Sequence, residues 1–374
     1  MKKVLVIPNY THFGPSKDIN RDSFLLVFKS FIENTSTDVE YHLPYPHNNR
    51  PGIINKFEHP NVEMFDMGHL TSFAPKMRVD FPYRFFQRML QDHEYDYIWS
   101  HLPEWTNGIA VTRIYNKSQP IYGYCHWWEI KENGARDKNS FINNIQGILQ
   151  MKTCGVNSKW VKKLVLKRAK DYFNDDVIKK LDTIIKPHYL GCSPYKKGKD
   201  KTPSILFNHR DDQYTGAEWF FKEIGKIWDK YKNFEVLTTL KDRQEPWVRY
   251  VGNSDRDIYL NNISEAAFGV GTFKDYSAWS MSVTDGLSVG VPYLLPKGLC
   301  YEEMVKDSCY LYNDRDDLIN IIDLLVTDRL GFSNDPFGED NIKSDVKRLQ
   351  WKNVLKGWDI PWLETETPTN LVGV

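Results

Sequence analysis

Residues 278–296 of the chain read Ala-Trp-Ser-Met-Ser-Val-Thr-Asp-Gly-Leu-Ser-Val-Gly-Val-Pro-Tyr-Leu-Leu-Pro. Small polar residues open the stretch, as is typical of a turn that enters a helix, and Gly290-Val291-Pro292 leads into an apolar strand. Asp285 falls within the predicted helix. The start of a helix favours anions, because its first backbone N–H groups lack partners inside the helix and the helix dipole is positive there. The stretch therefore predicts an anion site followed by a strand, although a simple turn or cap around Asp-Gly is an alternative.

A second informative stretch precedes the first. Ser204 to Asn208 predicts a strand, which is followed by His209-Arg210, and Ala217 to Tyr231 has the apolar spacing of an amphipathic helix. Further strands are predicted at three apolar runs, Phe234–Leu240, Ala267–Val270 and Val291–Leu295. Strands that alternate with helices indicate a parallel sheet of the α/β class.

The N-terminal half has the same alternation. A buried strand is predicted at Lys3–Pro8, and Arg21–Glu33 has helical spacing. Two further strands are predicted at Asp96–Ser100 and Ile121–Cys125, and a helix at Lys159–Phe173 with Ser158 as its N-cap. In open α/β sheets the carboxyl ends of the strands face the ligand, so polar residues that follow these strands are candidates for function.

The length of 374 residues favours two domains, each large enough for its own core. The polar segment from Tyr195 to Pro203 lacks periodic apolar residues and is interpreted as a linker. We therefore expect an N-terminal α/β domain over 1–195, a C-terminal α/β domain over 203–340, and a helical tail over 341–374 that packs back on the body. The tail carries three tryptophans: Trp351, Trp358 and Trp362.

The stretch at 278–296 resembles the donor site of the GT-B glycosyltransferases, whose pattern runs Glu, seven residues, Glu-Ala-Met-Ala and Gly-x-Pro. The resemblance implies an α/β GT-B fold of two Rossmann-like domains facing an interdomain cleft. It makes 1–195 the acceptor domain and 203–340 the donor domain, which is similar to those of retaining glycogen synthases and mannosyltransferases. It places Asp285 on the acid that takes the ribose hydroxyls. The family's first Glu falls on Ser277, with Asp275 nearby as a possible substitute. The turn that receives the donor diphosphate falls on three residues: Ser282, Val283 and Thr284.

The earlier stretch also matches the family. In many GT-B enzymes the first strand of the donor domain ends in an Arg, followed five residues later by Lys, and both cations bind the diphosphate. Arg210 matches the first cation, whereas Thr215 occupies the second position. Lys241 or Arg243, after the next predicted strand, could replace the missing Lys. The alternative for Arg210 is a surface ion pair with Asp211 or Asp212.

Two His-x-x-Glu clusters follow strands of the N-terminal half, at His101–Glu104 and His126–Glu129. We interpret His101, Glu104, His126 and Glu129 as acceptor-side residues that contact a sugar or act as general base on the incoming hydroxyl. Packing of a partly buried His126 is the alternative. Such clusters can hold metals on a helix, but these follow strands, and GT-B chemistry needs no metal. No metal site or cofactor is therefore expected, even at the Asp-x-Asp triplets 255–257 and 314–316.

The segment 159–201 is basic: it contains 12 lysines and one arginine but only five aspartates, in a chain of zero net charge. A solvated helix face is the usual meaning of such a run. Because aromatic residues are interleaved, a contact with a phosphate backbone is the functional alternative. The candidate DNA-binding residues in its helix are four lysines: Lys159, Lys162, Lys163 and Lys167.

These observations predict a glycosyltransferase that uses a nucleoside diphosphate sugar, with a UDP-sugar favoured. Its format resembles phage enzymes that glycosylate 5-hydroxymethylated pyrimidines, so double-stranded DNA is the expected acceptor. A saccharide, a lipid-linked glycan or a tRNA nucleoside is the alternative acceptor, and an inactive GT-B-like binding module is the alternative from another class. The start of the chain lacks a signal-peptide pattern, no run of 18 apolar residues occurs, and five unpaired cysteines fit a reducing compartment. We expect a cytoplasmic monomer without membrane contact.

Overall fold

The structure is a computed structural model. It describes residues 1–10, 23–36, 38–45, 58–68, 81–112, 119–126, 135–210, 215–253, 255–271, 278–306, 308–327 and 338–363. Six residues named above, Arg21, Glu129, Asp211, Asp212, Asp275 and Ser277, lie outside these ranges. The chain divides into two compact units, Met1–Tyr189 with Leu355–Val374, and Leu190–Val354. Each unit is described by itself.

The first unit contains a parallel sheet of seven strands in the order β3-β2-β1-β4-β5-β6-β7. Its strands are β1 (Lys2–Ile7), β2 (Val39–Tyr45), β3 (Val62–Asp66), β4 (Tyr97–Ser100), β5 (Ile121–Cys125), β6 (Thr153–Val156) and β7 (Ile185–Pro187). Its helices are α1 (Ser23–Ile32), α3 (Tyr83–Asp92), α4 (Pro103–Thr112), α5 (Ala135–Ile148), α6 (Lys159–Ala169) and α7 (Asp175–Ile184). The strand order reverses between β1 and β4, which is the switch point of a Rossmann-like sheet.

The second unit repeats this plan with six parallel strands in the order β10-β9-β8-β11-β12-β13. Its strands are β8 (Thr202–Phe207), β9 (Glu235–Thr238), β10 (Val248–Tyr250), β11 (Ala266–Val270), β12 (Tyr293–Pro296) and β13 (Cys309–Tyr312). Its helices are α8 (Ala217–Tyr231), α9 (Arg256–Ile263), α10 (Met281–Ser288), α11 (Tyr301–Met304), α12 (Arg315–Val326), α13 (Glu339–Leu349) and α14 (Trp351–Val354). The switch point lies between β8 and β11.

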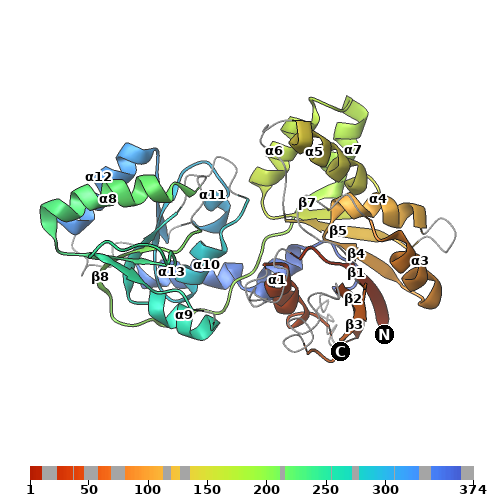
Figure 1. The fold of residues 1–374 in the computed structure, drawn as a ribbon, viewed down its shortest axis with the longest axis horizontal. Coiled ribbons are helices and arrows are strands. Elements are labelled where there is room, and N and C mark those ends of the chain that lie inside the picture. Colours follow the sequence, from red (N-terminus) through yellow and green to blue (C-terminus); the bar gives the residue numbers. More distant parts are fainter. Residues whose placement is uncertain are drawn as a thin grey trace, which may run out of the picture. The chain divides into compact units, whose positions relative to one another are not determined.

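Alternate residues of the second sheet enter two separate cores, as the strand period of two requires. Ile205 and Phe207 of β8 pack with α8 and α12, whereas Leu206 packs with α9, α10 and α13. Figure 1 shows the same arrangement, with α8 and α12 on one side of the sheet and α9, α10 and α13 on the other. Both faces are covered, which confirms the α/β class predicted from the sequence.

The unit boundary differs from the predicted linker at Tyr195–Pro203. The chain passes to the second unit between Tyr189 and Leu190, and the lysine-rich segment already packs there. The Tyr195 hydroxyl donates to Glu339 at 3.0 Å, Lys196 N to Ser288 O at 2.8 Å, and Lys201 Nζ to Ser264 O at 2.9 Å. Hydrogen bonds along the segment, together with the packing of Tyr195 against the core, hold it to the second unit, and neither produces a hydrophobic period in the sequence.

The predicted tail over 341–374 also divides between the units. Helices α13 and α14 belong to the second unit, whereas the described part of the chain from Leu355 on belongs to the first. In the first unit Trp358 packs 5.5 Å from Phe31, and the fully buried Trp362 packs 6.0 Å from Trp99 between ring centroids. Of the helices that the structure describes, none combines the length and apolar character needed to cross a membrane.

Candidate functional site

The switch point of the second unit carries the first part of the candidate site. Strand β8 ends at Phe207, and the side chains of Asn208 and His209 after it are buried. His209 Nε2 lies 2.8 Å from Val270 O at the end of β11, which fixes the two strand ends together. The next residue, Arg210, is exposed, and its backbone oxygen accepts a hydrogen bond from the Thr215 hydroxyl at 2.9 Å. Thr215 therefore binds the backbone of Arg210 and adds no cation.

Helix α10 begins where the sequence predicted a helix entry. Ser280 is its N-cap and accepts from Val283 N at 3.4 Å. The Val283 side chain is buried in the core and the Thr284 hydroxyl donates to Met281 O at 2.9 Å, so these side chains face inward. Val283 N already donates to the Ser280 hydroxyl and Thr284 N to Ser280 O at 3.2 Å, so anion binding at this turn would use the backbone N–H groups of Met281 and Ser282. The helix ends before Gly290, whose φ of +79° favours glycine.

A compact hydrogen-bond network joins the end of β8 to the first turn of α10. Asn208 Nδ2 donates to Ser282 O at 2.9 Å, and the Ser282 hydroxyl donates back to Asn208 O at 2.7 Å. The Tyr293 hydroxyl lies 2.9 Å from Ser282 O and 3.2 Å from Asn208 Oδ1. A Cβ atom at Gly286 would lie 2.3 Å from that hydroxyl, so this position of the helix requires glycine beside Tyr293. The turn is therefore rigidly positioned.

Asp285 forms a partly buried ion pair that the sequence did not reveal. Arg256, the first residue of α9, places Nη2 at 2.7 Å from Asp285 Oδ1 and Nη1 at 3.5 Å from Oδ2. The Asp285 side chain is 10% exposed and that of Arg256 is 40% exposed. Burial raises the pKa of the Asp285 carboxyl, and the nearby Arg256 guanidinium only partly offsets this. A carboxylate of α10 and a guanidinium of α9 therefore lie in direct contact.

The Asp-x-Asp triplets have a structural role in capping helices. Asp255 Oδ1 accepts from Asp257 N at 2.9 Å and Ile258 N at 3.0 Å at the start of α9. Asp314 is the N-cap of α12 and accepts from Asp317 N at 2.9 Å. The central arginine of the first triplet, Arg256, is the residue that pairs with Asp285. In the sequence, Arg256 stood out only as the central residue of this acidic triplet, and the triplet gave no indication of a contact with Asp285.

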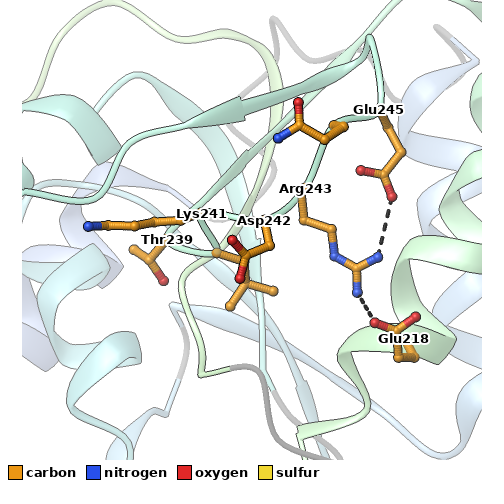
Figure 2. Close-up of a pocket in the computed structure, with 8 residues that line it drawn as sticks. Glu218, Thr239, Lys241, Asp242, Arg243 and Glu245 are labelled. Carbon is orange, nitrogen blue, oxygen red and sulfur yellow. Dashed lines mark hydrogen bonds and ion pairs between the residues drawn. The ribbon is translucent and has the colours of Figure 1, made fainter.

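Lys241 and Arg243 line a cavity of about 700 Å³ beyond the end of β9. Figure 2 shows the two side chains pointing in opposite directions, with Arg243 held by Glu218 and Glu245. The Arg243 guanidinium also lies 4.3 Å from the centre of the Phe221 ring. Because Arg243 is already paired with two carboxylates, Lys241, which is exposed, is the better candidate for an incoming anion.

In the first unit, the polar residues after β4 and β5 lie side by side. His101 Nδ1 is 2.9 Å from His126 Nε2, and His101 N donates to Ile7 O at 2.8 Å across the switch point. His101 is fully buried, and burial followed by the nearby His126 lowers its pKa well below the usual value. His126 is partly exposed. A direct contact with an acceptor is thus open to His126 but not to His101.

Glu104 has a different neighbour from the one that its His-x-x-Glu spacing suggested. It lies in the first turn of α4, and the Asn144 amide of α5, oriented with its nitrogen toward the carboxylate, donates to Glu104 Oε2 at 3.1 Å and to Oε1 at 3.2 Å. The carboxylate therefore links α4 to α5. Glu129 and Ser277 lie outside the described residues.

The lysines of α6 divide into two groups. Lys159, Lys163 and Lys167 are exposed along one face, while Val161 and Val165 are buried on another. Lys162 instead pairs with Asp182 of α7 at 2.8 Å. The predicted N-cap at Ser158 is confirmed, since its hydroxyl accepts from Val161 N at 3.1 Å. Three of the four candidate lysines thus form one exposed stripe.

The sequence matches no protein-family model and no curated protein. Solved structures match the fold over most of the chain. HepE from Anabaena in complex with UDP-glucose has 12% identity and a TM-score of 0.65, and the match covers 95% of this chain and 98% of that one. Sucrose-phosphate synthase from Thermosynechococcus elongatus has 14% identity and a TM-score of 0.72, with coverage of 95% and 96%. The chain has the GT-B fold.

A third GT-B structure is similar over the same length. The lipopolysaccharide outer core galactosyltransferase WaaB, in its apo form, has 11% identity and a TM-score of 0.60, covering 96% of this chain and 98% of that one. Identities this low support the fold alone. The GT-B fold predicted from residues 204–296 is thus confirmed, and the roles of the individual residues stay predictions.

Proposed function

We propose that this GT-B chain is a glycosyltransferase that takes its sugar from a nucleoside diphosphate sugar bound to the second unit. One observation carries the proposal. The first turn of α10 is tied through Ser282 and Asn208 to the end of β8 at the switch point, and Asp285 lies one turn further along the same helix. An anion-binding helix start followed by a carboxylate matches the diphosphate and the ribose hydroxyls of such a donor.

The proposed chemistry breaks the bond between the sugar C1 and the diphosphate oxygen and forms a bond from C1 to the acceptor oxygen. The leaving diphosphate gains negative charge, which the N–H groups of α10 and the cations Arg210 and Lys241 would stabilise. Asp285 would accept hydrogen bonds from the ribose hydroxyls. The groups assigned here to the diphosphate and the ribose all belong to the chain, and the proposal includes no cofactor beyond the sugar nucleotide.

On the acceptor side, His126 is the proposed general base, and it would take the proton that the acceptor hydroxyl loses. His101 is a positioning residue, since its Nδ1 holds His126 Nε2 at 2.9 Å while its own ring is fully buried. In the tautomer in which His126 Nε2 donates to His101 Nδ1, the lone pair that would take the proton belongs to Nδ1 of His126.

A UDP-sugar is the favoured donor and a saccharide is the favoured acceptor. HepE, which is similar in fold, is in complex with UDP-glucose, and WaaB is described as a lipopolysaccharide outer core galactosyltransferase. Double-stranded DNA with 5-hydroxymethylated pyrimidines is the second candidate acceptor. The exposed stripe of Lys159, Lys163 and Lys167 on α6 favours it, since lysines at this spacing can contact successive phosphates.

The test is release of nucleoside diphosphate from a panel of UDP- and GDP-sugars, with saccharides or hydroxymethylated DNA as acceptor. We expect release from a UDP-sugar that a saccharide stimulates, and its loss in Asp285→Asn. The matched control is Asp345→Asn, because Asp345 is also a buried carboxylate paired with an arginine of the second unit, at 2.9 Å from Arg348. Absence of release from every donor would instead support an inactive binding module.

The two acceptors are separated by charge reversal on α6. For DNA, Lys163→Glu with Lys167→Glu should weaken transfer and reduce its salt dependence, whereas Lys179→Glu with Lys180→Glu on α7 serves as control. Lys162→Glu is unsuitable, since it also breaks the pair with Asp182. If only DNA stimulates release and the α6 variant is impaired, the DNA acceptor replaces the saccharide.

A further inference from the structure

Three potential metal ligands meet on the first sheet, outside every residue considered above. Glu40 and His42 lie two positions apart on β2, so their side chains lie on the same face. Glu63 of β3 is in register with His42 on the neighbouring strand. The two carboxylates and the imidazole therefore converge on one point of the sheet surface.

The distances between their ligand atoms fit a small divalent ion. His42 Nε2 lies 3.0 Å from Glu40 Oε1 and 3.4 Å from Glu63 Oε2, and the three ligand atoms all lie within 4.8 Å of one another. In a tetrahedral zinc site with bonds of about 2.0–2.1 Å, neighbouring ligand atoms are about 3.3 Å apart. The cluster can thus surround an ion with small side-chain movements.

The imidazole is held in the orientation that a metal ligand needs. His42 Nδ1 is 2.9 Å from the Tyr95 hydroxyl, and the His42 ring is fully buried. When Nδ1 donates its proton to Tyr95, the lone pair of Nε2 faces the carboxylates and is available to a metal. The Glu63 side chain is 55% exposed, which leaves a path to solvent.

Lys3 contacts the cluster through the second oxygen of Glu40. Lys3 Nζ lies 3.5 Å from Glu40 Oε2, the oxygen that does not face His42. Glu40 Oε1, Glu63 Oε2 and His42 Nε2 remain directed at one another. The two carboxylates and Lys3 together carry a net negative charge, which attracts a cation to the point where the three ligand atoms meet.

The cluster lies at the amino ends of its strands, since β2 begins at Val39 and β3 at Val62. Ligands of open α/β sheets bind at the opposite, carboxyl ends. We propose that Glu40, His42 and Glu63 form a binding site for a divalent transition-metal ion, with Zn²⁺ the best match and water completing the coordination. The ion would join the edge strand β3 to β2 and takes no part in sugar transfer.

The test is binding of Zn²⁺ to the full chain after treatment with a chelator and desalting, measured by competition with a chromogenic chelator. We expect one ion per chain, at least tenfold weaker binding in Glu63→Gln, and about tenfold weaker binding in Tyr95→Phe, which removes only the partner of Nδ1. The control is Glu58→Gln, an exposed glutamate shortly before β3 that should bind as the wild type does.

Two readouts keep the test decisive. Co²⁺ in place of Zn²⁺ should give the intense visible absorption of a tetrahedral site in the wild type and lose it in Glu63→Gln. Because Glu63 is half exposed, this variant should fold, which circular dichroism checks. Equal Zn²⁺ affinity in the wild type and Glu63→Gln, or a Co²⁺ spectrum like that of the hydrated ion, would overturn the proposal. Neither outcome depends on glycosyltransferase activity.

Discussion

Arg256→Met removes the cation that pairs with the buried Asp285, and its effect should depend on pH. In the wild type the two side chains are joined by hydrogen bonds of 2.7 and 3.5 Å. The substitution leaves a carboxylate that is 10% exposed without its cation. Asp285→Asn instead removes the buried charge and leaves Arg256, whose side chain is 40% exposed and can turn to water.

The two substitutions should differ in how much stability they remove, because Asp285 is more deeply buried than Arg256. Removing one partner of a buried ion pair costs about 3–5 kcal/mol. Because Arg256 is partly exposed, we expect about 2–3 kcal/mol for Arg256→Met at pH 7, and about 1 kcal/mol for Asp285→Asn. With a slope of about 2 kcal/mol per molar urea for a unit of this size, the unfolding midpoint should shift by about 1–1.5 M for Arg256→Met and by about 0.5 M for Asp285→Asn.

The sign of the pH dependence follows from the raised pKa of Asp285. Between its unfolded and folded pKa values this carboxyl binds more protons in the folded state, so its contribution to stability falls as pH rises. Loss of Arg256 raises the pKa further. The cost of Arg256→Met should therefore be largest at pH 7 and should shrink toward pH 4.5, where protonation removes the unpaired charge.

The assay is urea unfolding of both variants at pH 7 and pH 4.5, with Arg348→Met as control. Burial raises the pKa of Asp345, but hydrogen bonds from Lys306 N–H, Ser308 and Arg348 outweigh it and the net pKa is lowered. In Arg348→Met the donors Lys306 N–H and Ser308 remain. The loss of stability caused by this substitution should therefore not become smaller at low pH. Equal costs for Arg256→Met at both pH values, or a larger cost for Asp285→Asn, would refute the reasoning.

Three further predictions concern stability. Ser280→Ala removes the N-cap of α10 and should cost about 1 kcal/mol in urea unfolding, with Ser280→Asp retaining the cap and the stability. Trp362→Ala should cost about 3–5 kcal/mol and reduce hydrogen-exchange protection in β4 and β5 but not in β8, because Trp362 is fully buried in the first unit. Burial lowers the pKa of His188 to about 4, so the folded state loses about 3 kcal/mol as pH falls from about 6.5 to about 4. His188→Gln should flatten the stability profile in that range, and an unchanged slope would contradict this assignment.

Strong local patterns predicted much of the fold. The strand at Ile121–Cys125 and the helix at Ala217–Tyr231 have the predicted bounds, because each carries a clear apolar period between breaking residues. Strands β2 and β3 were not predicted. Glu40, His42 and Pro44 interrupt β2, and β3 is an edge strand whose residues are half-buried or exposed, so neither has the continuous apolar run of a central strand.

The candidate site was predictable only where its residues follow strand ends or share one motif. His101 and His126 follow neighbouring strands, and Asp285 lies in the helix marked by Gly290-Val291-Pro292. Arg256 lies 29 residues before Asp285, and nothing in the sequence connects the two. The pairing of Arg243 with Glu218 and Glu245 likewise depends on side-chain geometry that only the structure provides.

The most direct test of the central claim is calorimetric titration of UDP into the wild type, Asp285→Asn and Asp345→Asn. Hydrogen bonds to a charged group contribute about 1.5–3 kcal/mol each, so the account predicts UDP binding that is about tenfold to hundredfold weaker in Asp285→Asn and unchanged in Asp345→Asn. Equal UDP affinity in the wild type and Asp285→Asn, or no UDP binding by the wild type, would contradict the assignment of α10 and Asp285 to the donor nucleotide.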